Sequence, residues 1–126
     1  MIDIDNKDLY LGLVNDALNM MGLSWEQFYI PLFPTSVYTG LIHGPAFTTR
    51  GRLVDSNENY QLLDRIRLDI YDERVFHDNP IVVLEANDDK VAHSGDITSL
   101  IYQKLGAVGW VSDGKIRDIE KINKTN

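Results

Sequence analysis

The stretch from Gly95 to Asp118 constrains the fold more than any other part of the chain. It contains, in order, an apolar helix pattern, a glycine, a hydrophobic strand, an Asp-Gly turn and an Arg-Asp pair. Twenty residues separate Asp96 from Arg117. A helix followed by a strand and a tight turn can return the chain to the point where the helix began. The order therefore predicts that the Arg-Asp pair lies close to Asp96.

The rest of the chain alternates helix and strand patterns, which favours an α/β layered domain. Apolar residues recur at helical intervals in three segments, and short apolar runs indicate buried strands. We expect a right-handed crossover between the strands that flank the third helix. The expected helices cover 8–21, 60–75 and 97–105, and the expected strands cover 41–53, 81–84, 91–94 and 107–111, with an irregular aromatic arm over 25–38.

Length and composition bound the class of protein. A chain of 126 residues predicts one domain, spanning 1–126, that is large enough for its own core. A hydrophobic content of 44% without any run of about 18 apolar residues argues against a spanning helix. The acidic N-terminus lacks the apolar region of a secretory signal, and the chain has no cysteine. We therefore expect a cytoplasmic protein with no membrane partner.

The net charge of −7 bears on the partners of the chain. Phosphate backbones are bound mainly by Lys and Arg, and this chain has 12 of these against 19 acidic residues. Direct binding of nucleic acid is therefore disfavoured. An acidic surface can still attract a basic protein partner by electrostatic steering.

The residues at the two ends of the stretch from Gly95 to Asp118, which we call the constraining stretch, have complementary chemistry. The first backbone N–H groups of a helix lack acceptors within the helix, so Gly95, Asp96 and Ile97 form a candidate site for a small carboxylate. Arg117 can donate two hydrogen bonds to a carboxylate or an enolate oxygen. Asp118 supplies a hard oxygen ligand of the kind that Mg²⁺ or Mn²⁺ prefers.

Each of these residues also has a purely structural reading. Asp96 could cap the helix by accepting the N–H of Thr98 or Ser99, and the Arg-Asp pair could be a solvated turn. Asp113 lies in the Asp-Gly turn and is expected to be structural. His93 could contact a ligand, but we expect a hydrogen-bonded histidine at the end of a strand.

Four segments of the chain carry a family resemblance, namely VNDALNMMG (14–22), GLIHGPAFTTR (40–50), DNPIVVLEAN (78–87) and GDITSLIYQKLGAVGWVSDGKIRD (95–118). They resemble the RraA-like family, which includes class II pyruvate aldolases and non-enzymatic regulators of ribonuclease activity. In the order of that family they correspond to the opening helix, the first core strand, the strand before the signature and the signature itself. The resemblance implies a layered swivelling-type β/β/α domain with central strands flanked by helices, abbreviated at its C-terminus.

The resemblance implies a metal-dependent lyase that acts on small 2-oxo acids, by pyruvate aldolase or oxaloacetate decarboxylase chemistry. Arg117 and Asp96 would be catalytic, with Arg117 stabilising the enolate and Asp96 handling a proton. Gly95 and Ile97 would join them in binding the substrate, and Asp118 would bind Mg²⁺ or Mn²⁺. By the same resemblance we expect a homo-oligomer, namely a trimer.

Two departures from the family pattern support an alternative to the lyase function. The aldolases usually carry an acidic residue three positions after the aspartate of the Arg-Asp pair, where this chain has Lys121, with Glu120 one step earlier. Family members also continue well beyond the position that corresponds to Asn126. The alternative function is a non-catalytic regulator that binds a ribonuclease or another basic protein, or a degenerate homologue.

Overall fold

The computed structural model describes residues 10–23, 34–35, 40–53, 69 and 76–125. The contacts within the chain divide it into two compact units, Met1–Pro31 and Leu32–Asn126. The expectation of a single domain over 1–126 stays a prediction.

The described residues of the first unit contain helix α1 (Leu11–Met20), which confirms most of the helix expected over 8–21. The helix ends where Gly22 adopts a positive φ of 76°, a conformation that glycine reaches without a steric penalty. Two hydrogen bonds close this end, from Gly22 N to Asn19 O at 3.0 Å and from Leu23 N to Leu18 O at 2.9 Å. This pattern satisfies carbonyl groups that the helix itself leaves without donors.

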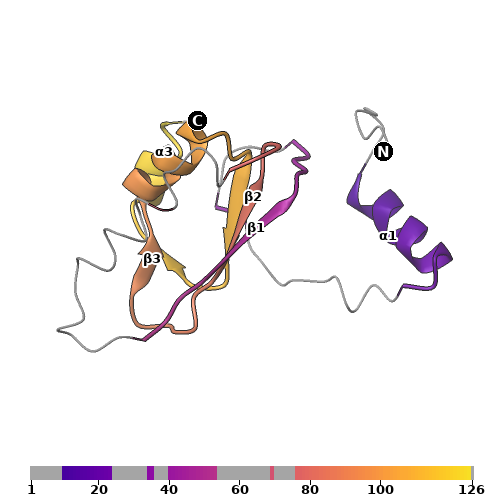
Figure 1. The fold of residues 1–126 in the computed structure, drawn as a ribbon, viewed down its shortest axis with the longest axis horizontal. Helices are drawn as coiled ribbons and strands as arrows, with labels where there is room; N and C mark the ends of the chain where they lie inside the picture. The colour runs from indigo at the N-terminus through magenta and orange to yellow at the C-terminus, as the bar shows by residue number, and fades with distance from the viewer. Residues whose placement is uncertain (1–9, 24–33, 36–39, 54–68, 70–75, 126) are drawn as a thin grey trace. The chain divides into compact units, whose positions relative to one another are not determined.

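The second unit is built on a sheet of three parallel strands in the order β1-β2-β4 (Figure 1). Central strand β2 is bounded by Asp78-Asn79-Pro80 and by Asn87, where residues with positive φ reverse the chain. Together with the helices, the parallel pairing confirms the α/β class. The strands are β1 (Ala46–Arg50), β2 (Ile81–Glu85) and β4 (Gly109–Ser112).

Strand β1 is shorter than the strand expected over 41–53. Gly44 lies so close to the carbonyl of Asn79 that a side chain there would collide with it. Pro45 has no N–H to donate to a ladder, although its carbonyl accepts a hydrogen bond from Ile81 N at 2.9 Å. Regular pairing therefore begins after the Gly-Pro pair, at Ala46.

The core lies on the face of the sheet that carries Val82, which is fully buried. In the parallel register, Phe47 and Trp110 flank Val82 on the two neighbouring strands. Phe76 and Tyr102 pack onto this row, with ring centroids 6.1 Å apart. Because Tyr102 belongs to the helix α3 (Asp96–Lys104), this core fixes that helix against the sheet.

Two further strands and two helices complete the described part of the second unit. Strands β3 and β5 pair in parallel and form a separate two-stranded sheet. The elements are β3 (Ala92–Ser94), α3 (Asp96–Lys104), β5 (Lys115–Ile116) and α4 (Ile119–Ile122).

The expected crossover needs a correction. The strands that flank α3 in sequence are β3 and β4, and they belong to different sheets. Within the main sheet, β2 and β4 are the parallel neighbours, so the connection between them includes both β3 and α3. The three-residue strand β3 does not join the main sheet and pairs instead with the two-residue strand β5.

Other expectations fall largely outside the described residues. This is true of the helix expected over 60–75, of which only Asp69 is described, and of most of the aromatic arm over 25–38. Within the part of the chain that the structure describes, no helix is long and apolar enough to cross a membrane.

Candidate functional site

The pairing of β3 with β5 brings the two ends of the constraining stretch together. Carboxyl ends of parallel strands lie at the same edge of a sheet. Ser94 pairs with Ile116 in the register, and Arg117 N donates a hydrogen bond to Ser94 O at 3.0 Å. Gly95 follows the end of β3 and Arg117 follows the end of β5, so the closeness expected from the sequence is confirmed.

Gly95 forms the floor of this junction. A Cβ atom at Gly95 would lie 3.0 Å from Asp118 Oδ2, 3.1 Å from Arg117 Cγ and 3.2 Å from Arg117 Nε. These distances are shorter than most real Cβ contacts, so the absence of a side chain lets the Arg-Asp pair approach the start of α3. The backbone of Gly95 is extended, with φ −157°, and any residue can adopt that conformation. The lack of space for a side chain, and not the backbone conformation, therefore explains why glycine suits this position.

Arg117 and Asp118 form an ion pair, with Arg117 Nε 3.5 Å from Asp118 Oδ2. The arginine side chain is 73% exposed and the aspartate 34% exposed. Asp118 adopts a left-handed conformation, with φ 62°, and it is the N-cap residue that precedes α4. Aspartate tolerates this conformation better than most residues. The guanidinium is thus close to Gly95 and open to solvent.

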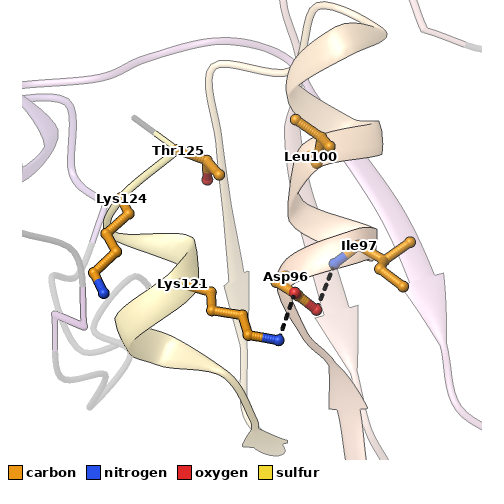
Figure 2. Close-up of a pocket in the computed structure, with 6 residues that line it drawn as sticks. All are labelled: Asp96, Ile97, Leu100, Lys121, Lys124 and Thr125. Atoms are coloured by element: carbon orange, nitrogen blue, oxygen red, sulfur yellow. Dashed lines mark hydrogen bonds and ion pairs between the residues drawn. The ribbon is translucent and has the colours of Figure 1, made fainter.

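Asp96 is fixed by contacts to both of its carboxylate oxygens. Its Oδ1 accepts a hydrogen bond from Ile97 N at 2.9 Å, and its Oδ2 lies 3.4 Å from Lys121 Nζ (Figure 2). Partial desolvation raises the pKa of Asp96, but the Ile97 N–H and the Lys121 ammonium outweigh it and hold the pKa below its ordinary value. Asp96 is therefore ionised at neutral pH.

The capping role considered for Asp96 is wrong in detail. Gly95 is the N-cap of α3, and Asp96 is the first residue of the helix. The carboxylate does not cap Thr98 or Ser99, because it turns back to the adjacent Ile97 N–H. This hydrogen bond also occupies one of the N–H groups expected to receive a substrate carboxylate.

A pocket of about 330 Å³ lies between α3 and α4 (Figure 2). The lysines come from α4 and the turn that follows it, and the apolar residues come from α3. The sequence pattern did not mark Lys124 or Thr125 as site residues, since α4 is a single turn and too short to produce a periodic pattern. Leu100 belongs to the apolar pattern of the helix expected over 97–105, and it lies on α3. The pocket is lined by Asp96, Ile97, Leu100, Lys121, Lys124 and Thr125, and Arg117 and Asp118 are not part of this lining.

The fit to a divalent metal rests on Asp118. Among the described residues, no three His, Asp or Glu side chains gather into one group. Mg²⁺ commonly keeps several water molecules and binds proteins through one or two carboxylates. Asp118 Oδ2 already lies 3.5 Å from Arg117 Nε, and Asp96, a second carboxylate at the same helix start, lies 3.4 Å from Lys121 Nζ. A divalent ion would have to compete with these two cations for the carboxylates.

Two other candidates are structural, as expected. His93 Nε2 and Asp88 Oδ2 lie 2.8 Å apart. Asp113 Oδ1 accepts a hydrogen bond from Ala86 N at 2.6 Å and so ties the turn before β5 to the end of β2. Asp88, the partner of His93, also accepts hydrogen bonds from Lys90 N and Val91 N, and these hold the pKa of Asp88 below its ordinary value.

The model of the RraA-like family, described as Aldolase/RraA, matches residues 13–126. No curated protein and no solved structure matches the chain significantly. The family match includes every residue of the junction and confirms the resemblance drawn from the sequence motifs.

Proposed function

This chain belongs to the RraA-like family, and from this premise we propose that it is a metal-dependent lyase acting on small 2-oxo acids. The family description, Aldolase/RraA, covers both catalytic and regulatory members. The proposal includes the finer fold, a layered swivelling β/β/α domain. One observation carries the proposal, namely the packing of Arg117 and Asp118 against Gly95.

Arg117 would bind and stabilise the reacting part of the substrate. In the decarboxylation of oxaloacetate, the bond between C3 and the departing carboxylate breaks, CO₂ leaves and the electron pair moves onto the keto oxygen. A guanidinium that donates to this oxygen stabilises the enolate more than the neutral keto group. The side chain of Arg117 is mostly exposed, so it is free to reach a substrate above Gly95.

Asp118 would hold Mg²⁺ or Mn²⁺. When bound, the metal would polarise the keto group of the 2-oxo acid. Because the Asp118 carboxylate lies beside Gly95, its ligand position adjoins the start of α3. The N–H groups there carry a partial positive charge that favours the substrate carboxylate.

Asp96 would assist the protonation of the enolate. Pyruvate forms when C3 of the enolate receives a proton from a water molecule, and an ionised carboxylate beside that water can orient it. The contacts with Ile97 N–H and Lys121 keep Asp96 ionised and fix its position. They also make it a weak base, which suits orientation better than proton abstraction.

The release of pyruvate from oxaloacetate in the presence of Mg²⁺ tests this proposal. Arg117→Ala should lower kcat/KM by a hundredfold or more, on the order of 3 kcal/mol of transition-state stabilisation. Arg50→Ala is a matched control, since Arg50 is 74% exposed and pairs with Glu85 on the main sheet. If the two variants retain equal activity, Arg117 has no catalytic role.

The ion pair between Asp96 and Lys121 favours a second candidate, a non-catalytic protein that binds a basic partner such as a ribonuclease. In that reading the pair stabilises the contact of α3 with α4. With a net charge of −7, binding should weaken as salt rises. A chain that shows no Mg²⁺-dependent turnover and captures a basic protein only at low salt would support it. If the chain captures no basic protein at low salt, that result would count against the non-catalytic function.

The assembly and the location of the protein are also proposals. By family membership we propose a homo-oligomer, with a trimer as the expected form, in the cytoplasm. The proposed substrate is a small anion, and direct binding of nucleic acid is not part of the proposal.

A further inference from the structure

The pocket between α3 and α4 contains two apolar side chains that the proposed reaction does not use. Ile97 and Leu100 both line it, and they remain 69% and 38% exposed. Residues three apart on a helix lie on the same face, so these two side chains form one apolar surface. A concave site with an apolar wall and a few polar groups is typical of the places where small ligands bind.

The other side of the pocket carries two lysines. They are Lys121 on α4 and Lys124 in the turn that follows it (Figure 2). Lys121 Nζ lies 3.4 Å from Asp96 Oδ2, so the charges of these two residues offset each other. In the part of the chain that the structure describes, the ammonium of Lys124 has no ion-pair partner. Two lysines and one aspartate leave the described lining with one surplus positive charge, although the chain has a net charge of −7.

Lys124 can approach an anion without breaking a contact. Figure 2 shows its amine pointing away from the Asp96 carboxylate, and a lysine side chain is long and flexible. The aliphatic part of the side chain can lie along an apolar surface while the ammonium turns to a ligand. The Asp96 carboxylate repels an anion from the start of α3. These charges direct the carboxylate of a ligand to Lys124.

The lining excludes several kinds of ligand. Two ammonium groups repel a metal cation, and an inorganic anion would leave the apolar surface of Ile97 and Leu100 in water. The volume of about 330 Å³ is at the small end of the range for ligand pockets, so it suits a small molecule better than a segment of a protein. The ligand that fits has a carboxylate at one end and an apolar chain at the other.

We propose that this pocket binds small monocarboxylates that carry an apolar chain of several carbon atoms. The chain lies on Ile97 and Leu100, and the carboxylate pairs with the ammonium of Lys124. This binding goes beyond the proposed lyase function and does not depend on it, because Arg117 and Asp118 are not part of the lining.

A series of carboxylates of increasing length tests this inference on the full chain. Acetate, butanoate and hexanoate are titrated by isothermal calorimetry, and the shifts of backbone amide signals in NMR spectra locate the bound ligand at 97–100 and 121–125. Each buried methylene should tighten binding by about threefold to fourfold, since apolar surface is removed from water. Hexylamine, which has a similar chain and the opposite charge, should show no saturable binding at the same concentrations.

Substitutions separate the two contacts of the ligand. Lys124→Gln should weaken hexanoate binding by about fivefold, the upper range for an exposed ion pair, and Lys124→Arg should preserve it. Lys104→Gln is the control of equal charge, because Lys104 is exposed at the end of α3 and lies outside the lining. Leu100→Ala should reduce the gain in affinity with each methylene. Val91→Ala is its control, since Val91 is 57% exposed and also lies outside the lining.

Hexanoate that shows no saturable binding, or that binds no more tightly than acetate, would overturn the inference. So would an equal loss of affinity in Lys104→Gln and Lys124→Gln, or a chain-length dependence that Leu100→Ala leaves unchanged. Arg117→Ala separates this pocket from the proposed lyase site. That variant should keep the wild-type affinity for hexanoate, and a loss of binding would show that the carboxylate occupies the junction at Gly95 instead.

Discussion

At the scale of single residues, Gly95 decides whether the candidate site exists. Its missing side chain is the reason that Arg117 and Asp118 can approach the start of α3. The identity of the residues that meet there was predictable, because their order along the chain implied a return. The partner of Asp96 was not predictable, since the contact with Lys121 depends on how α4 packs against α3.

Gly95→Ala should displace the Arg-Asp pair without unfolding the protein. The added Cβ would collide with Asp118 Oδ2 and with the side chain of Arg117. We expect kcat/KM for oxaloacetate to fall at least tenfold and the free energy of unfolding to fall by about 1 kcal/mol. Gly109→Ala is the control, because its Cβ would meet Ile42 instead. Equal activity of the two variants at equal stability would contradict the role of Gly95.

The contacts of Asp96 predict a pH dependence of stability. Its pKa is lowered in the folded chain from the ordinary value of 3.8, so its contribution is present above that value and is lost as the pH falls through the folded pKa. Asp96→Asn should therefore be less stable than the wild-type chain at pH 7, and the difference should shrink by pH 3. Urea unfolding at both pH values measures this. A difference that is constant with pH, or matched by exposed Asp89→Asn, would contradict it.

At the scale of elements, the longer helices and strands were predicted from the sequence and the shortest ones were not. The helices α1 and α3 and the strand β2 carry apolar patterns several residues long, and the sequence predicted each of them. Strand β5 and helix α4 were not predicted, because two and four residues are too few for any period to be visible. These two short elements position Arg117, Asp118 and Lys121. The sequence therefore predicted that the site residues meet, but not the elements that hold them.

Asp113 tests the connection between the main sheet and β5. Its carboxylate accepts the N–H of Ala86 at the end of β2, a partly buried contact. Asp113→Ala leaves that N–H without its acceptor and should lower the free energy of unfolding by about 1–2 kcal/mol. Chemical denaturation measures the change, with the exposed Asp89→Ala as the control. A loss no larger than that of the control would show that the turn before β5 holds without Asp113.

At the scale of the whole molecule, the two faces of the main sheet differ in how they are covered. Parallel sheets usually have both faces covered. In the described residues the core residues lie on the Val82 face, and the other face carries partly exposed side chains such as Val83.

A trimer predicts a solution mass of three times 14.4 kDa. Light scattering coupled to size exclusion measures this mass directly. Repeating the measurement at high salt separates packing from electrostatic attraction, because only the second weakens strongly with ionic strength. A monomer at all protein concentrations and salt concentrations would contradict the proposed homo-oligomer.

The most direct test of the central claim is a crystal structure of the chain with Mn²⁺ and oxalate, a stable mimic of the enolate of a 2-oxo acid. We predict oxalate above Gly95, with one carboxylate against the guanidinium of Arg117 and an anomalous peak for Mn²⁺ beside the Asp118 carboxylate. Oxalate bound away from Arg117, or a junction that binds neither ligand at saturating concentrations, would contradict the claim that these residues form one site.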